Sequence, residues 1–416
     1  MGELVPGPWG SPPPADVPIE ARTGEVSFLG RRLALLGILL RGYVLTLATF
    51  GIYRFWLVTQ RRRFYWSNTM VDDQPLEYTG SSVQLLVGFL LAVVVFIPVY
   101  GTVFYVSTAA PEYAALAYLA MFGGFFFLSG YAAFRGRRFR LTRTLWRGIR
   151  FGQSGSAWIY ALKRFFWIPV VIITLGLAYP AMVTSLYRYR FSNTWFGDRR
   201  MVFAGKAGAL AKVFYGLYAI NLVLACIVLY QSVANPWSTT ADGTPVPSMT
   251  GGTWLAVSLL VLCLSVPLYI SRERSAMLSS ISLGEARLAV RMPARWLVAQ
   301  YLCYGLFAIV LTTVLFLVLG LVVTVAEQGA FAGALQAIST FGRGIGAVLA
   351  IVLGYLTVVT LYATLWEIVI GLGYWKLLAE GARIENVDAI ETVRAHGAES
   401  PNIGEGLADA LNVGSY

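Results

Sequence analysis

The sequence has few charged side chains: only 13% of its 416 residues are Asp, Glu, Lys or Arg. A soluble globular domain has roughly a quarter, so too little polar surface remains to cover a water-facing globule of this size. The missing charges leave long apolar runs, each near or above the ~20 residues that cross a hydrocarbon core. These runs are residues 83–106, 113–134, 213–233, 253–271, 296–325 and 345–374. The sequence therefore predicts an all-α fold, a polytopic helical membrane protein with about six crossings.

Histidine and cysteine are nearly absent as well. One histidine, His396, is too few for a multi-histidine metal site. The three cysteines, Cys226, Cys263 and Cys303, lack the paired spacing of a disulfide framework or a zinc site. The sequence contains no HExxH, GxSxG, P-loop or paired CxxC motif. We therefore expect no metal, no cofactor and no catalytic residue, and an enzyme is the function that the sequence favours least.

Positive charge is in excess, with a net charge of +11. In membrane proteins Lys and Arg concentrate in cytoplasmic loops, where they face anionic lipid, so we expect anionic headgroups as partners and no nucleic acid. Residues 59–82, 135–164, 188–212 and 272–295 contain three, nine, six and five such residues, whereas 234–252 contains none. The first four are predicted to be cytoplasmic and the last periplasmic.

The sequence matches itself when it is shifted by 125 positions. Residues 49–80 align with 174–205 without a gap and with 10 identities, where about two are expected from the composition. Identical positions that define the motif are Gly51, Ser67, Asn68, Asp73 and Gly80, which align with Gly176, Ser192, Asn193, Asp198 and Gly205. We predict an internal repeat. Its two "SNT" turns either stop and cap helices or form a pseudo-symmetric pair that lines one cavity.

Three stretches, "TFGIYRFWLVTQRRRFYWSNT", "LEYTGSSVQLLVGF" and "LTRTLWRGIRFG", together resemble the YjgN-like family of uncharacterised bacterial inner-membrane proteins. The resemblance extends from about Phe28 to about Asn386. It implies a location in the inner membrane and a multi-pass architecture. It implies no activity, because none is established for the family.

Two further apolar stretches, 33–58 and 165–187, conflict with the charge pattern if they cross the membrane. A crossing at 165–187 would place its two basic flanks on opposite sides. Pro169, Gly176 and Pro180 favour a bend there, so we predict re-entrant or interfacial segments. An ordinary crossing by 33–58, with an outside N-terminus, is the alternative to a chain with both termini in the cytoplasm.

The predicted organisation follows from these segments. It comprises a disordered Pro-rich tail (1–27), a first repeat unit (28–134, with segments 33–58, 83–106 and 113–134), a basic linker (135–164), a second unit (165–271, with segments 165–187, 213–233 and 253–271), a basic linker with a C-terminal helical pair (272–376, with segments 296–325 and 345–374) and a polar cytoplasmic tail (377–416).

A few charges lie within apolar runs, where they are costly and mark candidate sites. They are Arg41, Arg54 and Glu367. Glu367 either pairs with one of these two arginines or, like them, extends independently to the headgroups.

Other arginines lie beside aromatic residues at the ends of apolar stretches. They are Arg61, Arg62, Arg63, Arg188 and Arg190. We interpret them as interfacial anchors that contact headgroup phosphates, with a specific anionic ligand as the alternative.

The function that these features favour is a non-catalytic scaffold that binds a membrane-protein partner with its basic cytoplasmic face. A transporter or lipid-handling protein with a cavity between the two repeats is the alternative.

Overall fold

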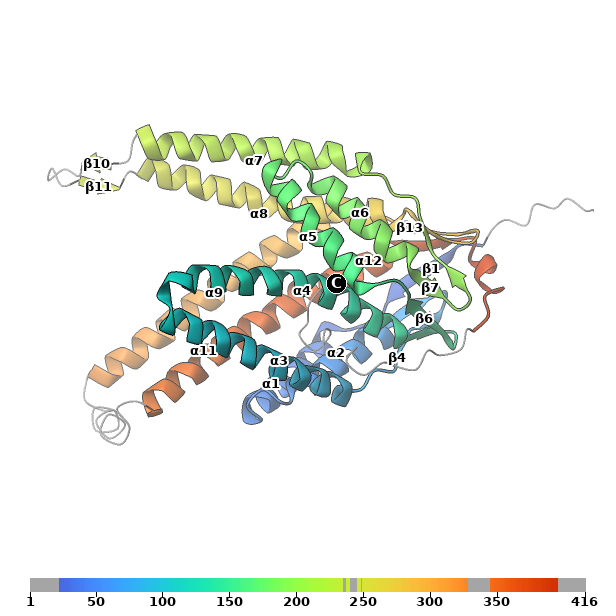
Figure 1. Cartoon of the computed structure of the whole chain (residues 1–416), viewed down its shortest axis with the longest axis horizontal. Helices are drawn as coiled ribbons and strands as arrows, with labels where there is room; N and C mark the ends of the chain where they lie inside the picture. The colour runs from blue at the N-terminus through green and yellow to red at the C-terminus, as the bar shows by residue number, and fades with distance from the viewer. Residues whose placement is uncertain (1–21, 235–236, 240–244, 248, 328–344, 396–416) are drawn as a thin grey trace, which may run out of the picture.

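Most of the chain is helical in the computed structural model (Figure 1), which describes residues 22–234, 237–239, 245–247, 249–327 and 345–395. Among them, six helices are long and apolar enough to cross a membrane. This confirms the predicted helical, multi-pass membrane protein. The candidate spans are Ser82–Ala109, Pro111–Thr142, Gly208–Ala234, Gly251–Leu278, Ala294–Val318 and Val352–Glu380.

These spans belong to three helical pairs. The helices are α3 (Ser82–Ala109), α4 (Ala114–Thr142), α7 (Gly208–Ala234), α8 (Met249–Leu278), α9 (Ala294–Glu327) and α11 (Ile345–Trp366). A π-helical turn, η2 (Glu367–Gly371), continues α11 into α12 (Leu372–Glu380). The 3-10 turn η1 (Pro111–Tyr113) connects α3 to α4. In Figure 1 the pairs extend away from one end of the molecule, where most of the strands gather.

The stretches 33–58 and 165–187 each contain a sharp turn between two shorter helices. The first is α1 (Arg32–Ala48) and α2 (Arg54–Ser67), and the second is α5 (Ala157–Ile173) and α6 (Tyr179–Ser192). At 1.5 Å per residue, the 17 residues of α1 and of α5 span about 25 Å. Neither helix is among the six candidate spans found in the described residues.

The two turns have the same geometry. Gly51 and Gly176 have φ values of 92° and 91°, which glycine adopts without steric cost. Thr49 and Thr174 each donate a side-chain hydrogen bond of 2.7 Å to the carbonyl four residues earlier. Each threonine also accepts one from the backbone N–H four residues later, at 2.9 and 3.1 Å. The bend that we predicted within 165–187 is therefore present, and the matching stretch 33–58 contains the same bend.

Short strands, which the all-α prediction missed, follow many of the helices. They are β1 (Gly24–Phe28), β2 (Thr69–Val71), β3 (Gln74–Pro75), β4 (Glu77–Tyr78), β5 (Thr144–Trp146), β6 (Ile149–Gln153), β7 (Thr194–Phe196), β8 (Arg199–Arg200), β9 (Val202–Phe203), β10 (Trp237–Thr239), β11 (Pro245–Pro247), β12 (Ile281–Leu283), β13 (Ala286–Val290) and β14 (Ala382–Glu385). One sheet has the order β3-β2-β1-β14-β13-β12-β9 and another β4-β5-β6-β7-β8, while β10 and β11 pair separately. All pairings are antiparallel.

The segments predicted as basic linkers, 135–164 and 272–295, are therefore structured. The end of α4, the hairpin β5–β6 and the start of α5 occupy the first. The end of α8, the hairpin β12–β13 and the start of α9 occupy the second. Positive charge in a loop indicates the cytoplasmic side of the membrane, but it does not exclude that the loop forms paired β-strands.

The predicted terminal tails also need correction. Residues 24–28 form β1, and Gly24 pairs with Ile384 of β14, so the two ends of the described chain lie in one sheet. Val387 and Ile390, in the 3-10 turn η3 (Val387–Ile390), are buried between the sheets. The tails 1–27 and 377–416 therefore contain ordered strands and core residues. The rest of these predictions, on residues 1–21 and 396–416, lies outside the described residues.

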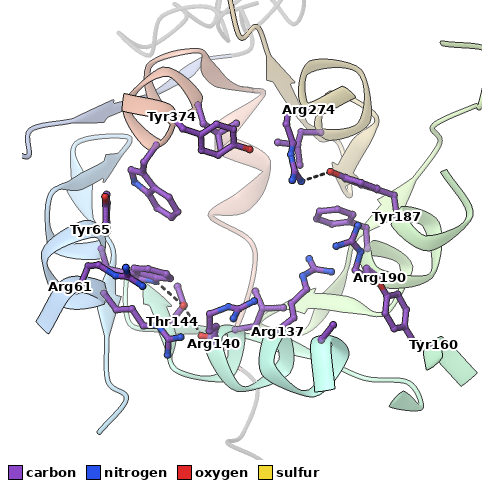
Figure 2. A pocket seen from close by; sticks show the side chains of 18 residues that line it. Arg61, Tyr65, Arg137, Arg140, Thr144, Tyr160, Tyr187, Arg190, Arg274 and Tyr374 are labelled. Atoms are coloured by element: carbon purple, nitrogen blue, oxygen red, sulfur yellow. Dashed lines mark hydrogen bonds between the residues drawn. The ribbon is translucent and has the colours of Figure 1, made fainter. Parts of the chain in front are cut away.

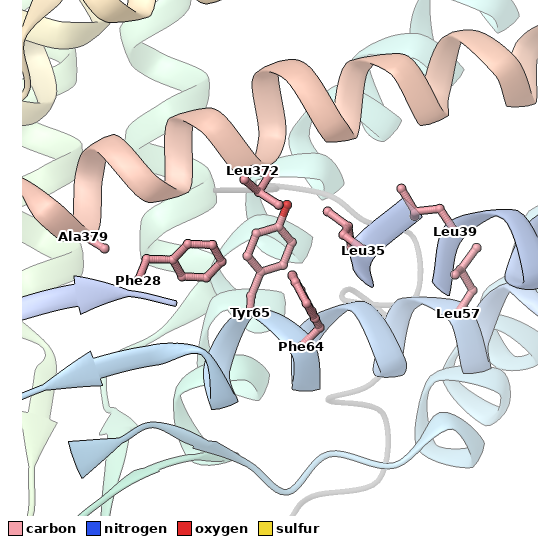
Figure 3. Packing of buried hydrophobic residues seen from close by; sticks show 8 residues of the cluster. All are labelled: Phe28, Leu35, Leu39, Leu57, Phe64, Tyr65, Leu372 and Ala379. Carbon is pink, nitrogen blue, oxygen red and sulfur yellow. The ribbon is translucent and has the colours of Figure 1, made fainter. Parts of the chain in front are cut away.

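The first hairpin is fixed by an apolar core that reaches from β1 to α12 (Figure 3). Its buried members are Phe28, Leu35, Leu39, Leu57, Phe64, Tyr65, Leu372 and Ala379. They come from β1, α1, α2, η2–α12 and their junctions, so this packing places α2 beside α12. Burial of each large apolar side chain contributes about 1.5–3 kcal/mol.

Candidate anion-binding cavity

Residues from six helices, α2, α4, α5, α6, α8 and α12, surround a cavity of about 390 Å³ near the strands (Figure 2). We call it the arginine cavity, because six arginines line it: Arg61, Arg62, Arg137, Arg140, Arg190 and Arg274. Its other walls are largely aromatic or aliphatic: Tyr65, Trp66, Ala133, Leu141, Thr144, Tyr160, Tyr187, Phe191, Leu278, Tyr374, Trp375 and Leu378. No acidic side chain is among the lining residues described by the structure.

Helical spacing brings the cavity residues of three helices to the same side. Arg274 and Leu278 of α8 are four residues apart, as are Arg137 and Leu141 of α4 and Tyr374 and Leu378 of α12, and all six line the cavity. Side chains at i and i+4 lie on one face of a helix. Each of these i, i+4 pairs therefore contributes one polar and one aliphatic residue to the wall.

The two segments that match in sequence contribute equivalent positions. Arg62, Tyr65 and Trp66 of α2 and, 125 positions later, Tyr187, Arg190 and Phe191 of α6 all line the cavity. The pairs share no identical residue. The matched segments thus supply the same backbone positions with different side chains, one arginine from each set.

A buried carboxylate lies behind one wall. Glu367 has a relative exposure of 5%, and it accepts hydrogen bonds from Arg61 Nη1 at 3.0 Å and from Tyr65 Oη at 2.9 Å. The sequence left two alternatives open for Glu367, an ion pair with Arg41 or Arg54 or independent extension to the headgroups, and the partner in the structure is Arg61. Arg41 and Arg54 are both exposed. The π turn that begins at Glu367 is a rare geometry that is common at functional sites.

A second glutamate lies behind the opposite wall. Tyr187 Oη accepts a hydrogen bond of 2.5 Å from Arg274 Nη1 and donates one of 3.3 Å to Glu273 Oε1. Burial raises the pKa of the Tyr187 phenol, against the lowering effect of Arg274. The phenol therefore keeps its proton at neutral pH and donates it to the carboxylate. Both glutamates are already engaged, and neither faces the cavity.

Arg137 and Arg190 are among the lining arginines with a buried donor that is not satisfied within the described residues. Nη1 of Arg137 and Nε of Arg190 are buried and have no hydrogen-bond acceptor among the described residues. The guanidinium of Arg137 lies 4.4 Å from the ring centroid of Phe191, and that of Arg190 lies 4.5 Å from that of Tyr187. These cation–π contacts offset part of the desolvation of each charge. Because a buried donor without an acceptor costs about 1–3 kcal/mol, an anion in the cavity would be stabilising.

A purely structural role explains only part of this arrangement. Arg140 and Arg190 lie in the last turns of α4 and α6, where a cation interacts favourably with the helix dipole by about 0.3–1 kcal/mol. Arg137 lies outside the last turn of α4. The dipoles therefore do not account for the convergence of all six charges.

Of the five arginines predicted as headgroup anchors, three line the cavity and two do not. Arg61, Arg62 and Arg190 are in its wall. Arg62 donates a hydrogen bond of 3.0 Å to Tyr78 Oη. Arg63 and Arg188 are exposed and donate to the carbonyls of Gly80 and Gly205 at 3.4 and 3.1 Å.

The motif residues mainly shape the helix ends. Asn68 and Asn193 each donate a side-chain hydrogen bond of 2.7 Å to the carbonyl four residues earlier. Ser67, Ser192 and Asp73 are exposed, and Asp198 accepts a hydrogen bond of 3.1 Å from the backbone N–H of Arg394. None of the motif residues lines the arginine cavity.

Sequence reasoning did not select Arg137, Arg140, Arg274 or Tyr374 as site residues. Arg137 and Arg140 were counted as loop charges, as was Arg274. A usable signal was present: Arg137–Leu141 and Arg274–Leu278 have the same spacing at the ends of two apolar runs. No cluster of His, Cys, Asp and Glu that is suited to a metal ion occurs in the described part of the chain.

Comparison with known proteins gives a family and a distant relative. The family model described as "Bacterial protein of unknown function (DUF898)" matches residues 23–251. The chain is 27% identical over 141 residues to inner membrane protein YjgN of Salmonella typhimurium, a match that covers 33% of this chain and 32% of the relative. No solved structure matches the chain.

Proposed function

The chain belongs to the DUF898 family, and from this premise we propose that it is an inner-membrane protein that binds the anionic group of a membrane lipid in its arginine cavity, without changing it chemically. The name of the relative supports the inner-membrane location. The observation that carries the proposal is the convergence of six arginines, among them Arg137 and Arg190, each with a buried donor that lacks an acceptor among the described residues. Guanidinium groups match the geometry of phosphate and carboxylate oxygens.

The cavity favours lipid binding over the scaffold function predicted from the sequence. A scaffold that holds an acidic partner needs its arginines on an outer face. Arg137, Arg190 and Arg274 instead face the arginine cavity among six helices (Figure 2). The proposal is therefore the lipid-handling alternative, and anionic headgroups remain the predicted partner.

A non-catalytic role follows from the composition of the cavity. General acid–base catalysis needs a titratable group within hydrogen-bond reach of the substrate. Arginine stays protonated, and the nearby glutamates are already engaged with Arg61, Tyr65 and Tyr187. The cavity can hold an anion, but it offers no poised base.

The proposal includes an internal repeat and an orientation. The equal turns at Gly51 and Gly176 and the equivalent cavity positions of α2 and α6 support duplication of a re-entrant hairpin. The arginine-rich end with the sheets faces the cytoplasm. Pairing of β1 with β14 supports a common, cytoplasmic side for both ends of the chain.

The test is lipid retention by the purified protein. Wild type and Arg190→Gln are isolated in native-lipid particles, and bound lipids are quantified by mass spectrometry after exchange into neutral lipid. We expect Arg190→Gln to retain at least tenfold less anionic lipid, because a hydrogen bond to a charged group contributes about 1.5–3 kcal/mol and 1.4 kcal/mol is tenfold.

The matched control is Arg188→Gln. Arg188 lies on the same helix but is exposed and outside the cavity, so this variant should retain as much anionic lipid as wild type. Equal losses in both variants would show that retention depends on surface charge, which contradicts a site in the cavity. Equal retention in Arg190→Gln and wild type would contradict it as well.

A further inference from the structure

A second cavity lies between the two larger sheets, next to the arginine cavity. Its volume is about 360 Å³, and we call it the intersheet cavity. Aromatic and aliphatic side chains from both sheets form its wall, among them Trp146 and Phe196 on one side and Ala286 and Leu288 on the other. Of its polar residues, Arg287 is exposed and can extend its charged end into water while its stem lines the wall.

The two cavities share part of their walls. Trp66, Leu141, Thr144 and Trp375 line both. The polar atoms of this boundary are occupied: Trp66 Nε1 donates to Thr144 Oγ1 at 2.9 Å, Thr144 Oγ1 donates to the Arg140 carbonyl at 2.8 Å, and Trp375 Nε1 donates to Thr69 Oγ1 at 2.9 Å. The boundary between the two cavities therefore consists mainly of rings and aliphatic groups.

We infer that the two cavities together bind a single-chain anionic amphiphile, with its phosphate or carboxylate head among the arginines and its hydrocarbon tail between the sheets. This inference rests on the proposed function and specifies the ligand class. The charged side chains that the structure describes in the wall of the arginine cavity are all cations, which suit an anionic head. The adjoining intersheet cavity has an apolar wall, which suits a hydrocarbon chain. Two chains would need more room than the intersheet cavity offers.

An apolar cavity of this size between two sheets is an unusual feature of a folded protein. Protein interiors are packed as densely as organic crystals, with few voids larger than a water molecule. A polar solute or a group of waters would find few partners here, because waters in cavities need two to four polar contacts. A hydrocarbon chain suits this cavity, because it can fill the volume and needs no hydrogen-bond partner.

The experiment maps the position of the tail. The full chain, in particles of neutral lipid, is incubated with dodecyl phosphate that carries a photoreactive diazirine at the chain end, and crosslinked peptides are identified. We expect crosslinks in β5–β7 and β12–β13, near Trp146, Phe196 and Leu288. Alkyl phosphates of increasing length should compete with an affinity that rises about fourfold per methylene.

Matched variants fill the cavity or leave it unchanged. Ala286→Phe places a ring in the intersheet cavity and should lower crosslinking at least tenfold. Ala289→Phe, on the same strand but outside that cavity, should crosslink like wild type. Where Ala286→Phe does not fold, Ser282→Phe serves the same purpose from β12.

The outcomes separate this inference from the proposed function. Crosslinks in the spans α3, α9 or α11 that Ala286→Phe leaves unchanged would place the tail in the bilayer and overturn the inference. Inorganic phosphate that raises the Tm of wild type but not of Arg190→Gln would then leave the proposed function standing. Crosslinks between the sheets that both phenylalanine variants reduce equally would also overturn the inference, because they would not depend on the cavity.

Discussion

Replacing Glu367 with glutamine removes the carboxylate that pairs with Arg61 in the cavity wall and keeps the shape of the side chain. The amide oxygen of glutamine can still accept the hydrogen bond that Tyr65 Oη now gives to Oε1 at 2.9 Å. The amide nitrogen is a donor and cannot accept from Arg61 Nη1, which now lies 3.0 Å from Oε2. The substitution therefore isolates the interaction with Arg61.

The expected loss follows from burial. The side chains of Glu367 and Arg61 are 7% and 17% exposed, so water screens the pair weakly. Breaking a buried ion pair by removing one partner costs about 3–5 kcal/mol. Because Arg61 also borders the cavity, where its charge can be partly solvated, we expect the lower end, about 3 kcal/mol, for Glu367→Gln.

The assay is a double-mutant cycle on unfolding in detergent with Glu367→Gln, Arg61→Met and both changes together. Removing both partners should restore most of the loss, with a coupling of about 2–3 kcal/mol. Losses that add within about 0.5 kcal/mol would refute the pairing. Phosphate should stabilise Glu367→Gln more than wild type, because Arg61 is then released to bind the anion.

Two further predictions concern the hairpins. Gly51→Ala and Gly176→Ala should each lower the Tm, because alanine at φ values of 92° and 91° costs on the order of 1–3 kcal/mol. The control Gly37→Ala, within α1, should be neutral or stabilising by up to about 1 kcal/mol. Equal effects of the three substitutions on the Tm would contradict backbone strain at Gly51 and Gly176. In a cysteine-free background, Glu112→Cys should react with an impermeant maleimide in intact cells and Arg200→Cys only after permeabilisation, and reaction of Arg200→Cys in intact cells would contradict the proposed re-entrant hairpin.

The membrane spans were predictable because each needs an apolar run of about 20 residues, a signal that few other structures produce. The turns at Gly51 and Gly176 were predictable from glycine itself. The strands were missed for the opposite reason. They are two to five residues long, too short for an alternating pattern to stand out, and they lie in stretches whose arginines already had an explanation in membrane orientation.

The site was only partly predictable. Glu367 was identified because a charge in an apolar run is costly, but its partner Arg61 was assigned to the surface. Linear distance hides the contact, since 306 residues separate the two. Arg137 and Arg274 become neighbours of the same space only when α4 and α8 are placed around α2 and α6, and the sequence of one chain does not specify that arrangement.

The same arrangement explains why one cavity can collect so much positive charge. α2, α4, α6, α8 and α12 all line it with residues from their last two or three turns, and each of the five is followed by a β-strand within a few residues. Arginines placed there to interact with headgroups or with the ends of their own helices are brought together when the helices converge. Local contacts explain the position of each guanidinium, but the six arginines together exceed the two nearby glutamates, Glu273 and Glu367, in charge. An anion in the cavity would neutralise part of this excess. Arginines that anchor separate helices at the membrane surface can thus form one binding site when those helices pack together.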